Sequence, residues 1–318
     1  MNKTRNVNSK VIFHNPSLCS EFLRDNIDIP ILKNVRPEDI EDVSTQYKTY
    51  MGTEFEADTV KKVRIKEHES LYVISLIEHK SEVDYNVIVQ LLKYMTCIWV
   101  EYAKEMEQKQ KGISRNKNFR YPPILPIVYY EGSAKWTAAL HLRERILMNE
   151  IFADYIPDFT YRLVGIHDYS NEELLNREDV MSFIMMLGKA QDEKNLTELF
   201  ASYGEKVDLI ILQATPEELQ IIENIICALL RKVNATEEEI ELCVEQVRRR
   251  QMGLLFENMQ KMDIQAERKN TEEEAGRMVI VLCQKFGKTK AEAKETLIEE
   301  RKLNETQAEE MIECYWKE

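Results

Sequence analysis

The first part of the chain alternates between helix and strand patterns. Residues 17–50 carry short helical signals, among them a proline placed to start a helix at Arg36-Pro37-Glu38. From Asp58 the pattern changes to alternating apolar and polar positions, followed by a polar turn and the β-branched run Leu-Tyr-Val-Ile-Ser-Leu-Ile. This pattern predicts two strands joined by a turn, of which the second is the more buried.

A helix and a third strand are predicted next. Apolar side chains recur at helical spacing from Val87 to Glu107, which indicates an amphipathic helix. The segment from Pro122 to Tyr130 reads as a strand that is entered through prolines and ended by Glu131-Gly132. The order helix, strand, strand, helix, strand predicts an α/β core whose helices pack on a sheet.

Beyond about residue 168 the strand signals stop and helix starts recur. A hydroxyl residue is followed three positions later by glutamate at Ser170, Thr215, Thr236, Thr271 and Thr289. In this motif the hydroxyl caps a free backbone N–H while the glutamate reaches back. We therefore expect two parts, an α/β domain over 1–168 and a mostly helical region over 169–318, with a coiled stretch around 236–285.

Composition excludes several function classes. The two closest glycines are Gly276 and Gly287, so neither a dinucleotide-binding glycine loop nor a phosphate-binding P-loop is present. The 6 cysteines form no C-x-x-C pair and the 5 histidines have no ligand spacing, which argues against a zinc site. Without a signal-peptide core or an apolar run of membrane-spanning length, we expect a cytoplasmic protein with no membrane partner.

Charge is distributed unevenly along the chain. The formal net charge is −13, yet residues 1–150 contain 22 Lys+Arg against 21 Asp+Glu, so the acidity lies in the second half. Residues 108–130 contain no acid. The cationic side chains of this basic loop, which could neutralise DNA phosphates, are Lys109, Lys111, Arg115, Lys117 and Arg120. A solvated surface loop is the alternative interpretation.

The segment Glu78-His79-Lys80 is the strongest candidate for chemistry. Side chains alternate along a strand, so Glu78 and Lys80 emerge on one face and His79 on the other. A carboxylate beside an ammonium at the end of an apolar strand can bind a divalent cation and hold a water. The alternatives are a surface Glu/Lys pair and, for His79, a buried core histidine.

Two further features extend this candidate. Asp58 opens the preceding strand, and a hairpin would bring it alongside Glu78. Gln90 and Tyr94 are four residues apart on the next helix and share a face. The constellation Asp, Glu-x-Lys, Gln-x-x-x-Tyr resembles the PD-(D/E)XK nuclease core. A longer stretch of the sequence resembles the Rpn recombination-promoting nuclease family, also called YhgA-like putative transposases. This stretch runs from Leu-Ile-Glu-His-Lys-Ser through Pro-Pro-Ile-Leu-Pro-Ile-Val-Tyr-Tyr-Glu-Gly to Trp-Thr.

The resemblance implies a restriction-endonuclease-like PD-(D/E)XK core and metal-dependent cleavage of double-stranded DNA in recombination or defence. It implies that Asp58 and Glu78 hold Mg²⁺ with the His79 carbonyl, and that Lys80 orients or deprotonates the attacking water. Gln90 and Tyr94 would position the DNA backbone or the lysine.

The chain also departs from the family pattern. Polar residues follow Asp58, so Glu54 and Glu56 are rivals for its role. An N-terminal acidic ligand is unassigned, because only Phe13-His14-Asn15-Pro16 occupies that region.

Two other functions stay open at this point. One is strand transfer by a transposase, which usually needs three spaced carboxylates on a different fold. The other is a DNA- or protein-binding module that has kept the core without turnover. A double-strand cut needs two nicking centres, which would suit a homodimer, although nothing in the sequence identifies an interface.

Overall fold

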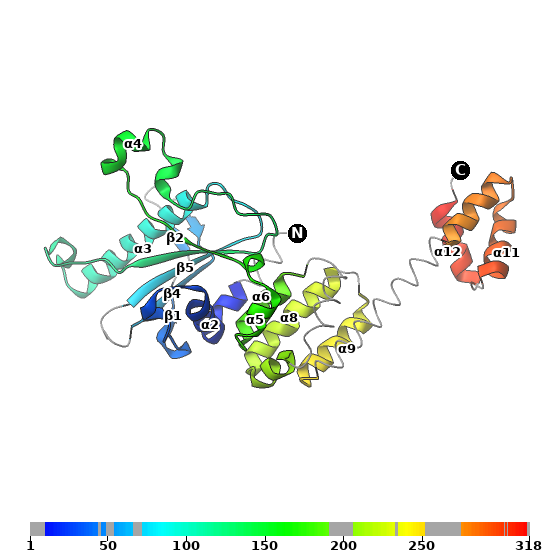
Figure 1. Ribbon diagram of the computed structural model, residues 1–318, viewed down its shortest axis with the longest axis horizontal. Helices are drawn as coiled ribbons and strands as arrows, with labels where there is room; N and C mark the ends of the chain where they lie inside the picture. The colour runs from blue at the N-terminus through cyan, green and yellow to red at the C-terminus, as the bar shows by residue number, and fades with distance from the viewer. Residues whose placement is uncertain are drawn as a thin grey trace. The chain divides into compact units, whose positions relative to one another are not determined.

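A computed structural model describes most of the chain (Figure 1). The described residues are 10–43, 46–48, 54–65, 72–190, 206–232, 235–251, 275–301, 303 and 305–316. They belong to two compact units, Met1–Gly253 and Leu254–Glu318. The boundary expected after residue 168 falls inside the first of these units.

The first unit is built on an open five-stranded sheet in the order β1-β4-β5-β6-β7. Its strands are β1 (Ile40–Asp42), β4 (Thr59–Arg64), β5 (Tyr72–Lys80), β6 (Ile124–Tyr130) and β7 (Arg162–Gly165). Antiparallel pairing joins β1 to β4 and β4 to β5, whereas β5, β6 and β7 run parallel. A separate ribbon pairs β2 (Gln46–Lys48) with β3 (Glu54–Glu56). The fold class is therefore mixed α/β, as expected.

The edges of this sheet differ from the sequence prediction. The expected helices before residue 40 are present as α2 (Pro16–Asn26) and the short turns η1 (Pro30–Leu32) and η2 (Pro37–Asp39). The structure also contains two edge strands that the sequence pattern does not predict. β1 lies where the pattern indicates short helices, and β7 lies where no strand is predicted. Both are too short for a two-residue period to be recognised. They form because β4 and β6 offer them a partner, with Ile40 opposite Val63 and Arg162 opposite Ile127.

Helices cover both faces of the sheet. On one face α3 (Val87–Lys109) buries Leu91 and Tyr94 in a cluster with Leu76 and Val128. On the other face, rings of the N-terminal segment pack edge-on against Tyr129, Phe13 at 5.2 Å and Phe22 at 5.8 Å. Since Val128 and Tyr129 are consecutive strand residues, these two clusters lie on opposite sides of the sheet.

The helical part of the first unit begins at the predicted caps. It contains α5 (Asn171–Leu175), α6 (Val180–Gly188), α8 (Pro216–Lys232) and α9 (Glu237–Arg248), and residues 206–213 are helical as well. The reciprocal Ser/Thr and glutamate bonds occur at Ser170, Thr215, Thr236 and, in the second unit, Thr289. The fifth motif, at Thr271, lies outside the described residues. These caps confirm four helix starts that the sequence predicts.

Helices after residue 168 pack directly on the N-terminal helix, which explains why the first unit extends so far. The Met181 N–H at the start of α6 donates to Glu21 of α2 at 3.0 Å. Arg177 donates to Asn26 at 3.1 Å. The sheet domain and the first helices of the predicted helical region therefore share one compact body.

The second unit has a small helical core. It contains a helix over 275–285, α11 (Lys290–Arg301) and α12 (Glu305–Tyr315). Its buried side chains are Ile280, Cys283, Ala293, Leu297, Ala308 and Ile312. The expected coiled stretch around 236–285 lies partly outside the described residues. Among the described helices, none has both the length and the apolar character that crossing a membrane would require.

Candidate active site

The β4–β5 hairpin brings Asp58 to Glu78. Thr59, the first residue of β4, is opposite Ile77, so the residue before Thr59 lies beside the residue after Ile77. Asp58 Oδ2 accepts a hydrogen bond from the His79 backbone N–H at 2.9 Å. Glu78 is buried, with 4% of its surface exposed. The structure therefore brings together the two carboxylates that the sequence singles out as metal ligands.

Lys80 joins this pair from the same face of β5. Its Nζ lies 3.3 Å from Glu78 Oε1 and 2.9 Å from Asp84 Oδ2. His79 is on the opposite face, where its Nε2 is 2.9 Å from Glu131 Oε2. The alternation predicted for Glu78, His79 and Lys80 is confirmed, and so is the interpretation of the His79 ring as a buried core group.

Helix α3 supplies the third side of the cluster. Gln90 Nε2 donates to Glu78 Oε1 at 2.7 Å and lies 2.8 Å from the Tyr94 hydroxyl. Gln90 Oε1 accepts from Lys80 Nζ at 3.0 Å. The Gln90 amide thus contacts both the carboxylate and the ammonium of the Glu-x-Lys motif. The five predicted site residues form one connected cluster: Asp58, Glu78, Lys80, Gln90 and Tyr94.

The electrostatics of the cluster are dominated by Glu78. Burial, with a contribution from the nearby Asp58 carboxylate, raises the pKa of Glu78 to about 7. Its Oε2 is buried and has no hydrogen-bond partner among the described residues. For Lys80, burial alone would lower the pKa, but the Glu78 and Asp84 carboxylates outweigh it and the pKa is raised. Lys80 is therefore a cation at neutral pH.

These features fit a hard divalent cation. A buried carboxylate oxygen without a partner, next to a second carboxylate, is the donor set that Mg²⁺ prefers, and a cation there would lower the cost of ionising Glu78. In the described part of the chain no group of three or more Asp, Glu, His or Cys side chains is arranged as a metal site. Backbone carbonyls and water would have to complete the coordination shell, as Mg²⁺ sites commonly allow.

Asp84 is a member of the cluster that sequence reasoning missed. Its carboxylate contacts Lys80 and also accepts from the Asn86 N–H at 2.8 Å. Burial opposes ionisation, but the bonds from Lys80 and Asn86 lower the pKa of Asp84. The four-residue spacing from Lys80 was the available signal, yet it lies in a turn where helical spacing rules do not apply.

The two rivals of Asp58, Glu54 and Glu56, belong to β3, and their side chains lie outside the described residues. Of the two acids of α2, Glu21 accepts a hydrogen bond from the Met181 N–H on the Tyr129 side of the sheet. The sheet separates that carboxylate from Glu78, so it cannot supply the unassigned N-terminal ligand.

The basic loop lies far from the cluster. It connects the C-terminal end of α3 to the start of β6, whereas Gln90 and Tyr94 lie near the start of α3. At 1.5 Å per residue, Lys109 is about 22 Å along the helix from Tyr94. All five predicted cations are exposed, and Phe119 stacks on Tyr102 with ring centroids 5.8 Å apart. The loop is thus a separate surface at the opposite end of the sheet.

Aromatic residues border the cluster on its other side. Trp136 Nε1 donates to the Tyr161 hydroxyl at 2.9 Å, and Tyr85 shares a 2.9 Å hydrogen bond with Thr137. Burial, with Glu144 and Asp84 nearby, raises the pKa of Tyr161. The crossover between β6 and β7 therefore reaches the neighbourhood of Lys80 through Asp84.

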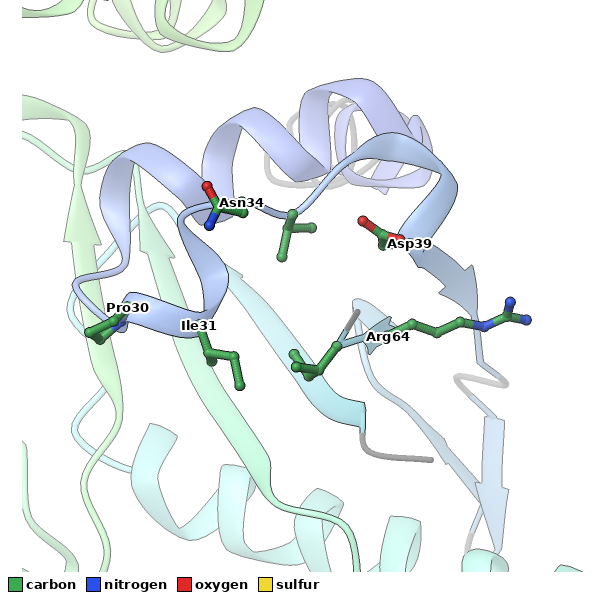
Figure 2. A pocket seen from close by; sticks show the side chains of 7 residues that line it. Pro30, Ile31, Asn34, Asp39 and Arg64 are labelled. Atoms are coloured by element: carbon green, nitrogen blue, oxygen red, sulfur yellow. The ribbon is translucent and has the colours of Figure 1, made fainter. Parts of the chain in front are cut away.

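A shallow pocket elsewhere in the first unit has no connection to the cluster. About 310 Å³ in volume, it is lined by Pro30, Ile31, Asn34, Val35, Asp39, Arg64 and Ile65 (Figure 2). Arg64 is at the far end of β4, about 17 Å from Thr59 at 3.3 Å per residue. Its guanidinium pairs with Glu41, and Asp39 accepts from the Arg36 N–H at 3.0 Å. The charged groups of the pocket are therefore already partnered.

Comparison with known proteins identifies the family. A family model described as "Putative transposase, YhgA-like" matches residues 9–218, which span the sheet, the cluster and α6. The chain belongs to the YhgA-like putative transposase family. This confirms the resemblance seen in the sequence. Searches of the curated proteins and of the solved structures found no match to the chain.

Proposed function

We propose that this YhgA-like protein is a Mg²⁺-dependent endonuclease that hydrolyses phosphodiester bonds of double-stranded DNA on a PD-(D/E)XK-type core. The observation that carries the proposal is the buried Glu78 Oε2, which has no hydrogen-bond partner among the residues that the structure describes, with the Lys80 ammonium 3.3 Å from the other Glu78 oxygen. A family of transposase type acts on DNA, which agrees with this substrate class.

Asp58 and Glu78 would hold the metal. When bound, Mg²⁺ supplies a Lewis acid that polarises the scissile phosphate and lowers the pKa of a water. The contribution of the protein is to hold the two carboxylates in place, while a bound cation would offset the cost of ionising the buried Glu78. The His79 N–H serves this purpose by fixing Asp58 Oδ2 at 2.9 Å, and Gln90 does so by fixing Glu78 Oε1 at 2.7 Å.

Lys80 would act as a cation in the hydrolysis. Its raised pKa keeps the ammonium protonated, so it can donate hydrogen bonds to the attacking water and to a phosphate oxygen but cannot remove a proton. Negative charge accumulates on the phosphate oxygens as water attacks phosphorus, and a fixed ammonium stabilises that charge. Gln90 and Asp84 are positioning residues, because they hold Lys80 Nζ in place.

Hydrolysis is favoured over strand transfer by the ligand set. Among the described side chains no group of three metal-binding carboxylates forms, and Asp84, the other acid of the cluster, is engaged by Lys80. The aromatic border that includes Tyr85 (56% exposed) leaves a ring available to lie against a sugar or a base.

Plasmid cleavage with matched variants tests the proposal. Supercoiled plasmid is incubated with Mg²⁺ and the full chain, or with Glu78→Gln or Lys80→Met. The controls, Glu82→Gln and Lys104→Met, remove the same charges from exposed positions outside the cluster. We expect nicked and linear products from the wild type and the controls, and none from the two site variants. Joined products would indicate strand transfer, and identical behaviour of all five proteins would refute the catalytic assignment.

A further inference from the structure

The crossover from β6 to β7 carries a large exposed apolar surface. We call it the crossover patch, and it consists of Leu147 (90% exposed), Met148 (57%), Ile151 (71%), Phe152 (46%) and Tyr155 (84%). These residues lie on and around α4 (Asn149–Phe152) and η5 (Ala153–Tyr155). Ile151 and Phe152 belong to α4, Leu147 and Met148 precede it, and Tyr155 ends η5, so the five exposed apolar side chains come from one short stretch of the crossover.

The base of the patch is firmly attached to the first unit. The Leu142 N–H donates to the Phe159 carbonyl at 3.2 Å, and the ion pair between Arg143 and Asp158 closes the loop. Leu142 is buried in the α3 cluster, against which Ile146 and Phe159 pack. The apolar side chains next to this anchor therefore point outward from a preformed base, and binding a partner would cost little ordering entropy.

The size of the patch matches what a stable protein interface requires. With an aromatic residue offering about 150–250 Å² and aliphatic ones somewhat less, its five side chains expose on the order of 700 Å². The largest apolar patch of a typical monomer is about 300–600 Å². A standard interface buries about 800 Å² on each partner. Such a surface is costly to leave in water and is the expected centre of an interface.

The charges around the patch decide which occupant fits. Arg145 lies at one end and the acids Glu150 and Asp154 lie along it, all exposed. None of the three forms an ion pair within the described part of the chain. The excess of acid repels DNA phosphates and anionic lipid. A second copy, turned by a two-fold axis, places the arginine of each copy toward the acids of the other.

We propose that the crossover patch is a self-association surface, occupied by a second copy of this chain. The interface is isologous, with the apolar face of each α4 buried against the other. One consequence rests on the proposed nuclease function. If that function holds, the dimer places two Glu78–Lys80 centres in one particle, as a double-strand cut needs.

Sedimentation equilibrium of the full chain, without DNA or Mg²⁺, tests the dimer independently of any cleavage. The test variant is Leu147→Asp with Ile151→Asp. The matched control, Met278→Asp with Phe286→Asp, places the same charges at two exposed apolar positions of the second unit, 67% and 76% exposed. We expect the wild type and the control to be dimers, and the dissociation constant of the test variant to rise at least ~100-fold.

A milder pair separates interface loss from misfolding. Leu147→Ala with Ile151→Ala should keep the wild-type circular dichroism spectrum and unfolding midpoint and still weaken the dimer. A wild-type chain that sediments as a monomer at every concentration overturns the proposal. So does a dimer that dissociates only in the second-unit control, since that result assigns the interface to the other unit. Absence of plasmid cleavage would leave this result unchanged.

Discussion

Replacing Glu78 by glutamine should stabilise the metal-free protein while abolishing its activity. Burial and the neighbouring Asp58 raise the pKa of this carboxyl from 4.5 to about 7. The folded state therefore holds the proton more tightly than the unfolded chain. The contribution of the Glu78 carboxyl to the free energy of unfolding is fully present below about pH 4.5. It is lost as the pH rises through about 7 and stays low above that pH. At 1.36 kcal/mol for each pKa unit, the charged carboxylate costs about 3 kcal/mol at pH 8.

Urea unfolding of the wild type and Glu78→Gln in EDTA measures this cost. The variant should be more stable by about 3 kcal/mol at pH 8 and by less than about 1 kcal/mol at pH 5, since glutamine carries no charge at either pH. Glu21→Gln is the matched control, because burial raises the pKa of Glu21 to about 7 as well. The control should gain stability in the same way, yet keep the activity.

Addition of Mg²⁺ at pH 8 completes the comparison. A ligand that binds only the folded state stabilises it, so the wild type and Glu21→Gln should both gain stability, whereas Glu78→Gln should not respond. Lower stability of Glu78→Gln than of the wild type at pH 8 in EDTA, or an equal difference between the two at pH 5 and pH 8, would contradict this prediction. Either result would mean that burial does not destabilise the charged form of Glu78.

Three further predictions follow from the structure. Lys80→Met should lower the cleavage rate at least ~100-fold with unchanged DNA affinity in a gel-shift assay, because the ammonium acts on charge that develops during reaction; loss of affinity alone would contradict this role. Replacing Lys109, Lys111 and Lys117 by alanine should weaken DNA binding and reduce the slope of log affinity against log salt by about 3. Bound DNA should still be cleaved at the normal rate, because the loop is far from Glu78. An unchanged slope would show that these lysines do not contact DNA. Arg250→Ala should lower the free energy of unfolding in urea by about 1–3 kcal/mol without affecting DNA affinity, since Arg250 donates to the carbonyls of Ile211, Leu212 and Ala214 at 2.5 to 2.7 Å. Weaker DNA binding would instead show that the run Arg248-Arg249-Arg250 contacts DNA.

The three consecutive arginines Arg248, Arg249 and Arg250 show how a local sequence pattern and the structure agree. Their position among glutamates predicts an ion-paired face, and the structure confirms this for Arg248 with Glu223 at 2.6 Å and Arg249 with Glu245 at 2.8 Å. Local rules of the same kind predicted four helix caps, the alternation of Glu78 and Lys80, and the shared face of Gln90 and Tyr94. Each depends on residues a few positions apart, where backbone geometry alone decides which side chains meet.

The sequence by itself determined which residues could make a metal-binding and catalytic cluster, because strand and helix periods place them on common faces. Only the tertiary structure decided that Glu78 Oε2 is buried with no hydrogen-bond partner in the described part of the chain, that Asp84 joins Lys80, and that the basic loop is at the other end of the sheet. The edge strands β1 and β7 and the exposed crossover patch also depend on long-range pairing and packing. Desolvation and contact between segments distant in sequence are properties of the folded chain, so no local pattern records them.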